Sequence, residues 1–249
     1  MTTIEIVSFS AKLQGTKRVN ATAEIINNCK ADILLFSGHT LDSGKDIVRL
    51  KEKISNKHSE VIFEVKDINS DILGNCLYRI TYGKIFNMNT NQLFSESKEI
   101  EDNYELADRF LYELNERRIL TIDNIKYLIL QCGEINILRN YQNQNNKVDF
   151  RLPQHQDLCK RFNTLLENIN VVINPIHSPM GNQGKMHKRR EFLSSRNKYY
   201  FSTCNTDEKH DNLNNLSLYY AYFNGKPINP ININKKSNYI SRSFELADL

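Results

Sequence analysis

A cysteine that follows an apolar segment is the residue of this sequence best suited to chemistry. The run Tyr127–Leu130 is apolar and predicts a buried strand, and Cys132, Gly133 and Glu134 come directly after it. Strand ends in α/β proteins open into ligand crevices, so a thiol at this point is placed to act as a nucleophile. A glycine lets a substrate or a sharp turn approach the thiol, and a helix starting after it would favour the thiolate. The alternative is that Cys132 is a small buried apolar residue.

Two further predicted strands end near a histidine. The buried strand Val171–Ile173 leads through Asn174 to His177, and the strand Ile33–Phe36 leads to His39. The imidazole titrates near neutral pH, so each histidine is a candidate general acid or base. The alternative role for His177 is to cap a turn. Three strand ends that carry Cys or His predict one shared pocket.

The most basic segment, Lys185–Arg190, invites two functional interpretations that the residues do not favour. No aromatic side chains are interleaved with its charges, so we interpret it as a solvated helix face and not as a nucleic-acid surface. The preceding stretch Gly181–Lys185 is shorter than a phosphate-binding loop, and Met186 stands where such a loop has a hydroxyl residue.

The elements that must position these residues follow from periodicity. Strands are expected at 4–9, 33–36, 61–65, 119–122, 125–130, 171–173, 199–203, 216–223 and 239–244, with two more in 72–88. Helices are expected at 19–29, 41–56, 100–118, 157–169 and 185–197, and an exposed loop at 141–147. This mixture of strands and helices predicts a layered α/β fold.

Composition sets the class of protein. The chain has 249 residues and a net charge of +4, with 25% charged and 40% hydrophobic residues. These values exclude a disordered chain, a fibre and a disulfide scaffold. We expect no nucleic-acid and no membrane partner, because the charge excess is small and no apolar run could span a bilayer. The five cysteines are far apart and form no CxxC pair, and the start of the chain lacks a basic signal-peptide region. Both features predict a cytoplasmic protein without a metal site.

The order of the segments resembles that of the carbon–nitrogen hydrolase (nitrilase/amidase) superfamily. The nucleophile segment of that family, "CxE", is matched by Cys132–Glu134. The other matching segments, in chain order, are Ala31–Gly38, Met88–Phe94, Val172–Pro175 and Asn197–Asn205. Together they span nearly the whole chain. The resemblance implies a four-layer αββα sandwich as a single domain over residues 1–249, paired into a homodimer through its helical face.

The resemblance also implies thiol hydrolysis of amides or nitriles without a cofactor. The family uses a cysteine, a glutamate as general base and a lysine that stabilises the tetrahedral intermediate. The cysteine corresponds to Cys132, but the base falls at Gly38 and the lysine near Thr90. A further family glutamate aligns with Arg196. Active members of the family therefore differ from this chain at three positions.

We therefore predict a rebuilt site that hydrolyses the C–N bond of a small amide or nitrile, not a peptide bond. The proposed catalytic residues are Cys132 paired with His177, Glu134 as the carboxylate that orients the imidazole, and His39 as a second candidate base. The expected substrate-binding residues are Gly133, Asn174 and Lys185. The alternative is a catalytically inactive protein of the nitrilase fold that binds a ligand or a partner.

Overall fold

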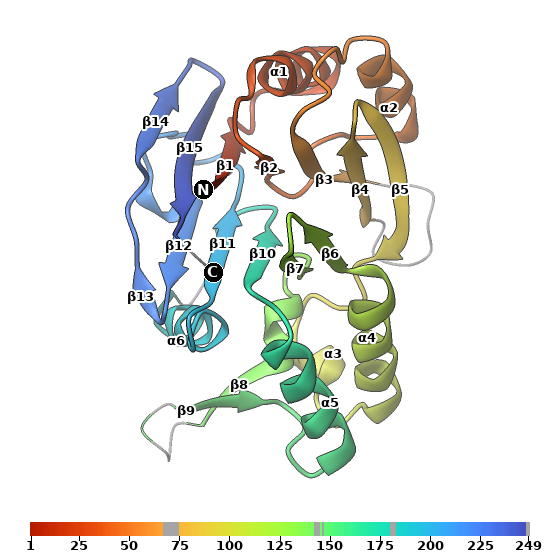
Figure 1. Cartoon of the computed structure of the whole chain (residues 1–249), viewed down its shortest axis with the longest axis vertical. Coiled ribbons are helices and arrows are strands. Elements are labelled where there is room, and N and C mark those ends of the chain that lie inside the picture. Colours follow the sequence, from red (N-terminus) through yellow and green to blue (C-terminus); the bar gives the residue numbers. More distant parts are fainter. Residues whose placement is uncertain (67–74, 142–144, 146, 180–182, 248–249) are drawn as a thin grey trace.

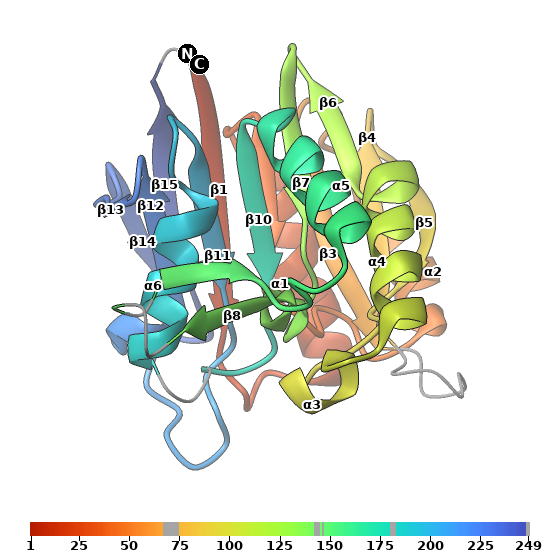
Figure 2. The same cartoon turned by 90° about the horizontal axis from the view of Figure 1, so that it is seen from below.

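Two β-sheets packed face to face form the centre of the computed structural model, and helices cover their outer faces (Figures 1 and 2). The structure describes residues 1–66, 75–141, 145, 147–179 and 183–247. The first sheet has the order β14-β15-β1-β2-β3-β4-β5. Its strands are β1 (Thr2–Phe9), β2 (Ile33–Phe36), β3 (Glu60–Lys66), β4 (Asn75–Thr81), β5 (Lys84–Asn91), β14 (Asn232–Lys235) and β15 (Tyr239–Leu246). The helices α1 (Gly15–Asn28) and α2 (Gly44–Lys51) lie on its outer face (Figure 1).

The second sheet has the order β13-β12-β11-β10-β7-β6. Its strands are β6 (Ile119–Ile122), β7 (Ile125–Ile129), β10 (Val171–Pro175), β11 (Tyr199–Thr203), β12 (Tyr219–Phe223) and β13 (Lys226–Pro227). Its outer face carries the helices α4 (Tyr104–Arg117), α5 (Gln156–Glu167) and α6 (Gln183–Leu193) (Figure 2). The remaining elements are α3 (Ser97–Ile100), the short 3₁₀ helices η1 (Glu134–Ile137) and η3 (Leu216–Leu218), and the hairpin β8 (Leu138–Tyr141) with β9 (Lys147–Phe150).

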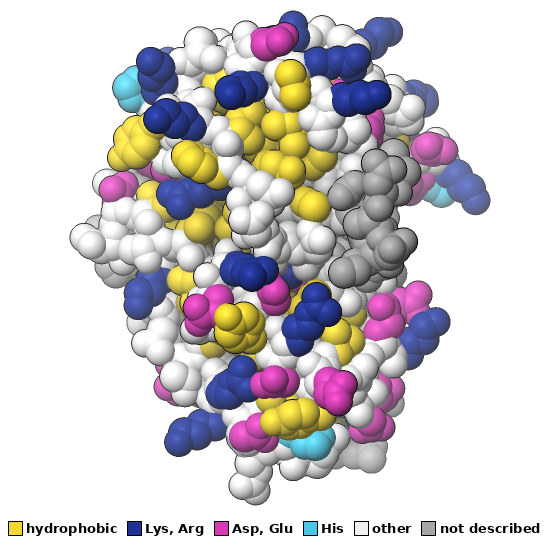
Figure 3. All heavy atoms as spheres, turned by 90° about the vertical axis from the view of Figure 1, so that its right-hand side faces the viewer, with side chains coloured by type: hydrophobic (Ala, Val, Ile, Leu, Met, Phe, Trp, Pro, Cys, Tyr) yellow, Lys and Arg dark blue, Asp and Glu magenta, His cyan; other side chains and the backbone are white. Residues whose placement is uncertain are grey.

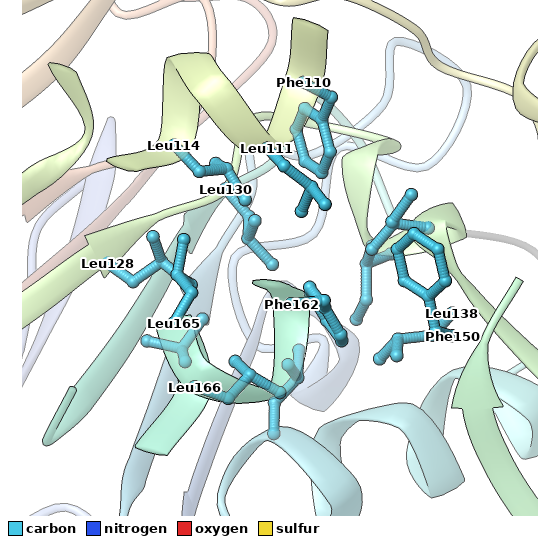
Figure 4. Close-up of a cluster of buried hydrophobic side chains, with 14 of the residues drawn as sticks. Phe110, Leu111, Leu114, Leu128, Leu130, Leu138, Phe150, Phe162, Leu165 and Leu166 are labelled. Carbon is cyan, nitrogen blue, oxygen red and sulfur yellow. The ribbon is translucent and has the colours of Figure 1, made fainter. Parts of the chain in front are cut away.

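Side-chain alternation along the strands builds the three largest apolar cores of the interior. In β1, Ile4 and Ile6 face the second sheet, whereas Val7 and Phe9 pack beneath α1. Successive side chains of a strand point to opposite faces, so a strand buried on both sides contributes to two cores. A third core fills the space between the second sheet and its helices (Figure 4). Three cores separate four layers, so the predicted αββα sandwich is confirmed.

Figure 4 shows how the third core is built. Leu128 and Leu130 project from the β7 segment toward Leu114 on α4 and Leu165 on α5. The helix α4 begins at an ordinary N-cap, since the side chain of Asn103 accepts the N–H of Leu106. The other labelled side chains come from α4, α5 and the hairpin β8–β9. Because Leu128 and Leu130 lie just before Cys132 in the chain, this core anchors the segment that leads to it.

The predicted elements are present in the described residues, with two informative differences. The helix expected over 41–56 is shorter, because Leu41 is hydrogen-bonded to β3 and the Asn27 side chain accepts the N–H of Ser55. The hairpin β8–β9 was not predicted. It carries Val148 and Phe150 into the core between polar neighbours, and the expected elements leave these strands unassigned on either side of the expected loop 141–147. Of the expected loop 141–147, residues 142–144 and 146 lie outside the described residues, as do 72–74 of the expected strand pair.

Charged side chains of both signs are interspersed over the lower half of the face in Figure 3, and basic side chains surround an apolar area in its upper half. Within the described ranges, no helix has both the length and the apolarity that crossing a membrane requires.

Candidate active site

Four neighbouring strands end at one place. β2 and β3 are parallel in the first sheet, and β7 and β10 are parallel in the second. The N–H of Gly38, after β2, donates to the carbonyl of Ile176, after β10, at 3.0 Å. This hydrogen bond joins the two sheets where their strands end. The polar residues around it are Glu64, His39, Cys132 and His177.

Glu64 is a fully buried carboxylate at the centre of this group. In β3, Ile62 faces the inter-sheet core and Phe63 faces the helices, so alternation turns Glu64 back between the sheets. Its Oε2 accepts a hydrogen bond from Nε2 of His177 at 2.9 Å, and its Oε1 accepts one from Nε2 of Gln131 at 3.0 Å. Burial by itself would raise the pKa of Glu64, but the charge and hydrogen bond of His177 lower it below its ordinary value.

His177 links this carboxylate to Cys132. Burial disfavours the imidazolium, but the Glu64 charge and a hydrogen bond with Cys132 raise the pKa of His177 to about 10. His177 is therefore protonated at neutral pH. Since Nε2 is bonded to Glu64, Nδ1 is the ring nitrogen that remains for the sulfur. The three side chains form a chain of carboxylate, imidazole and thiol.

His39 is a second imidazole that stacks on the first. The ring centroids of His39 and His177 are 3.6 Å apart, and the ring planes are inclined by 13°. Burial and the His177 charge lower the pKa of His39 to about 4, so this ring is neutral at pH 7. Its Nε2 lies 2.8 Å from Oδ1 of Asn75. The amide nitrogen of Asn75 donates to Gln92, so Oδ1 is an acceptor and His39 carries its proton on Nε2. The ring of His39 is thus held by a hydrogen bond and not by charge.

The space around Gly38, the position that the order of segments aligns with the family glutamate, has no room for a side chain. A Cβ atom on Gly38 would lie 2.3 Å from Cδ2 of His177 and 2.9 Å from Oε2 of Glu64. The Glu64–His177 pair therefore fills the volume that a side chain at this position would enter. The carboxylate beside Gly38 thus comes from the neighbouring strand β3.

The prediction that Glu134 orients His177 is wrong. Glu134 is fully buried, and its carboxylate pairs with the guanidinium of Arg118. It also accepts the N–H groups of Leu93 at 2.9 Å and Gln131 at 2.8 Å. Both carboxylate oxygens are engaged by these groups, and Glu64 binds the imidazole instead. The contacts of Glu134 hold the turn that carries Cys132.

The three expected substrate-binding residues lie in different environments. Gly133 has a φ of 80° and packs against the backbone of Ser95. Asn174 is fully buried, and its amide donates to the carbonyl of Leu130 at 2.7 Å. Lys185 is exposed on α6. Substrate binding by these residues stays a prediction.

Glu64 is the site residue that the sequence interpretation missed. It stands alone in the otherwise apolar run Val61–Val65, which was interpreted only as a strand. A buried carboxylate costs free energy unless it is paired, so one charge in the middle of such a run signals a partner elsewhere in the fold. Alternation from the neighbouring apolar residues would also have placed it between the sheets.

Among the described residues, no three side chains of His, Cys, Asp or Glu are grouped as a metal site. None of the five cysteines forms a disulfide.

No protein-family model matches the sequence, and no curated protein is significantly similar to it. Solved structures are similar in fold. The NitN amidase from Nesterenkonia sp. AN1 has a TM-score of 0.58 at 9% identity, over 100% of this chain and 94% of that one. A second similar structure is a CN-hydrolase superfamily protein from Xanthomonas campestris with an arsenic adduct in its active site. Its TM-score is 0.53 at 9% identity, over 98% of this chain and 90% of that one.

A further structure of the Nesterenkonia amidase carries the acetamide moiety of fluoroacetamide on its active-site cysteine. Its TM-score is 0.57 at 8% identity, over 98% of this chain and 90% of that one. The chain therefore has the fold of the carbon–nitrogen hydrolases, as the order of its segments predicts.

Proposed function

We propose that this protein is a thiol-dependent hydrolase that cleaves the C–N bond of a small amide. The observation that carries the proposal is the chain Glu64–His177–Cys132, with a fully buried carboxylate at one end, which lies at the strand ends of a carbon–nitrogen hydrolase fold. An imidazolium beside a sulfur favours the thiolate, which is the nucleophilic form. Glu64 fixes the ring and stabilises its positive charge, as the third member of a triad does.

In the proposed reaction, the Cys132 thiolate attacks the amide carbon, an S–C bond forms, and an electron pair moves onto the carbonyl oxygen. When that pair returns, the C–N bond breaks and His177 gives its proton to the departing nitrogen, which leaves as an amine or ammonia. Water then attacks the thioester carbon while the neutral imidazole takes a proton from it. The S–C bond breaks, the carboxylic acid leaves, and the thiolate and imidazolium are restored.

The same imidazolium supplies the positive charge that the family lysine would give. Thr90 stands near the lysine position, and its hydroxyl accepts a hydrogen bond from Nε of Arg118 at 2.8 Å, so it belongs to the Glu134–Arg118 group. In a water-excluded site, a charge beside the developing oxyanion is worth several kcal/mol. His177 would therefore both donate the proton to the leaving nitrogen and stabilise the negative charge of the tetrahedral intermediate.

The same resemblance and strand arrangement support three coarser proposals. Residues 1–249 act as a single domain, because strands from both halves of the chain enclose one inter-sheet core. The protein forms a homodimer through a helical face, as members of the resembled family usually do. It works in the cytoplasm on a small molecule, which agrees with its free thiols.

The experiment is a panel of small amides and nitriles assayed with wild-type protein, Cys132→Ala and Cys159→Ala. Cys159 is a matched control, since it is a partly buried thiol on α5, outside the site. We expect hydrolysis by wild type and Cys159→Ala, and a loss of about 10⁴-fold or more in kcat for Cys132→Ala.

Iodoacetamide labelling followed by peptide mass spectrometry gives a second readout. Cys132 should be alkylated faster than Cys159 in the native protein, and the Glu64→Gln substitution should slow Cys132 alone. If Cys132 reacts no faster in native protein than in urea and no amide is cleaved, the protein is the inactive, ligand-binding form of the fold.

A further inference from the structure

A cavity of about 310 Å³ lies between α5, β9 and the turn that joins α6 to β11. From α5 it is lined by Asn163, Leu166 and Glu167, whose three- and four-residue spacing puts them on one face of the helix. Val148 and Phe192 add apolar side chains to its wall. Sites for small molecules are concave, roughly 300 to 1,000 Å³ in volume, and combine apolar walls with a few polar groups. The cavity has the size and lining of such a site.

Lys198 is the buried cation of this cavity. The residue is 9% exposed and belongs to the cavity lining. An ammonium has three N–H donors, but among the described residues Nζ makes one long hydrogen bond, to the carbonyl of Ser195 at 3.5 Å. Within the described ranges it forms no ion pair, and Glu167 pairs with Arg196 instead, at 3.8 Å. Burial lowers the pKa of Lys198, and the Arg196 charge lowers it further against the charge of Glu167. A bound anion would supply the partner that this charge lacks.

A strained turn fixes the position of Lys198. Arg196 and Asn197 are consecutive residues with φ values of 61° and 59°, in the left-handed region that residues other than glycine rarely adopt. The N–H of Asn197 donates to the side-chain oxygen of Asn224 at 3.3 Å, and the N–H of Asn224 donates to the carbonyl of Lys198 at 3.1 Å. Strained backbone held by its surroundings is concentrated at ligand sites, because it places a side chain before the ligand arrives.

The other charges of the lining determine which anion fits. Lys147 pairs with Asp149 at 3.3 Å, just as Arg196 pairs with Glu167. The charged residues of the lining therefore leave one positive charge in excess, at Lys198. A monoanion balances this excess, whereas a phosphate dianion would bring a second negative charge toward Asp149 and Glu167. The apolar part of the wall favours a ligand whose remaining atoms are apolar.

We propose that this cavity binds a small monocarboxylate with an apolar body, whose carboxylate pairs with the ammonium of Lys198. Hydrogen bonds between charged groups are short and strong, so this pair would supply most of the affinity. The side-chain amide of Asn163 offers a further donor to the carboxylate. Val148 and Phe192 would pack against the apolar body.

The proposed site is separate from the candidate active site. The strand β11 begins at Tyr199, next to Lys198, and ends at Thr203. Beyond that end, the N–H of Asn205 donates to the carbonyl of His177 at 3.3 Å. The cavity and the candidate active site therefore lie at opposite ends of β11, and the carboxylate site does not depend on the proposed hydrolase function.

Calorimetry with benzoate, a monocarboxylate with an aromatic body, tests the site. We expect benzoate to bind the wild-type protein, and Lys198→Met to weaken this binding on the order of tenfold or more. Benzyl alcohol, which has the same body without the charge, should bind weakly to both proteins. Lys188→Met is the control and should keep the wild-type affinity, because Lys188 lies on α6 outside the cavity and pairs with Glu191 at 2.8 Å.

Urea unfolding distinguishes a binding role of Lys198 from a structural one. Methionine has a similar length and no charge, so Lys198→Met should leave the free energy of unfolding unchanged or higher while benzoate binding falls. Asn163→Asp is a second variant, at an exposed helical position, and its added negative charge in the lining should weaken benzoate binding severalfold. No benzoate binding to the wild type, or equal affinity in Lys198→Met and Asn163→Asp, would overturn the proposal.

His177→Gln separates the cavity from the active site, where a carboxylic acid is a product of the proposed reaction. Benzoate should bind His177→Gln as tightly as it binds the wild type. Binding that is lost in His177→Gln and retained in Lys198→Met would place benzoate at the active site and overturn the proposal. Phenyl phosphate, a dianion at pH 8, tests the ligand class: it should bind more weakly than benzoate, and tighter binding would overturn the assignment to a monocarboxylate.

Discussion

At the scale of single residues, the site pairs two stacked imidazoles whose pKa values are driven apart. Glu64 holds His177 as a cation, with a pKa of about 10, while burial and that cation keep His39 neutral, with a pKa of about 4. Titratable neighbours with separated pKa values mark distinct acid and base roles. His177 therefore carries the proton of the site, and His39 acts as a neutral support for its ring.

This charge state predicts how stability depends on pH. An unfolded histidine titrates near 6.5, so between pH 6.5 and about 10 the folded protein holds a proton on His177 that the unfolded chain releases. The contribution of His177 to the free energy of unfolding is fully present below pH 6.5 and is lost as the pH rises through about 10. His39 has the opposite effect on stability. Because its pKa is lowered in the folded protein, the unfolded chain takes up this proton first, and the free energy of unfolding falls as the pH drops from 6.5 toward about 4.

We expect His177→Gln to remove this dependence. Between pH 7 and 9, the wild-type free energy of unfolding should fall more steeply than that of His177→Gln, by up to about 1.4 kcal/mol per pH unit. Urea unfolding followed by circular dichroism measures both slopes. His58→Gln, at an exposed histidine, is the control and should keep the wild-type slope. Parallel curves for wild type and His177→Gln would contradict the protonated state assigned to His177.

At the scale of elements, the position of Cys132 depends on a single tight turn between β7 and η1. Gly133 takes a left-handed conformation there, with a φ of 80°, and its Cα faces the backbone of Ser95. The side-chain nitrogen of Gln92 donates to the carbonyl of Cys132, and the Glu134–Arg118 pair closes the turn from the other side. The backbone that carries the thiol is therefore held from both sides.

Gly133→Ala should disrupt this turn. A Cβ atom would lie 2.3 Å from the carbonyl oxygen of Ser95, and the left-handed backbone is unfavourable for alanine. We expect a loss of more than about 2 kcal/mol in the free energy of unfolding, with loss of activity. Gly44→Ala is the matched control, since nothing lies within 4 Å of its added atom. Equal stability of the two variants in urea unfolding would show that the turn tolerates a side chain.

At the scale of the whole molecule, the helices α4 and α5 offer the surface for the proposed homodimer. A hollow between them is lined by Leu111, Tyr112, Ile119, Lys160 and Leu165, among others. Tyr112 is 56% exposed on this surface, beside the apolar lining of the hollow, so a second chain packed here would cover it. An ion pair between Arg161 and Asp108 joins the two helices at this surface.

Light scattering coupled to size-exclusion chromatography tests the dimer. We expect the wild type to have the mass of two chains and Tyr112→Glu to shift toward one, because a carboxylate placed in an apolar interface must lose its hydration. Tyr82→Glu is the control, since Tyr82 is 79% exposed in the turn between β4 and β5, away from these helices. A Tyr112→Glu protein with the wild-type mass would place the interface elsewhere or exclude it.

The sequence by itself determined the layered fold, the strand that delivers Cys132 and the histidines at neighbouring strand ends. These features depend on apolar periodicity and on the order of segments, which are local properties of a chain. The hairpin β8–β9 was beyond this reasoning, because its alternation is too short to distinguish from a polar loop.

Only the tertiary structure decided which carboxylate serves which partner. Glu134 is two residues from Cys132 and yet binds Arg118, whereas Glu64 is 113 positions from His177 and binds it at 2.9 Å. Distance along the chain does not fix the direction of a side chain once strands from two sheets converge. A buried charge must pair with an opposite charge that is buried beside it, because each has lost its hydration. Which charges lie side by side depends on the packing of the sheets and not on spacing in the sequence.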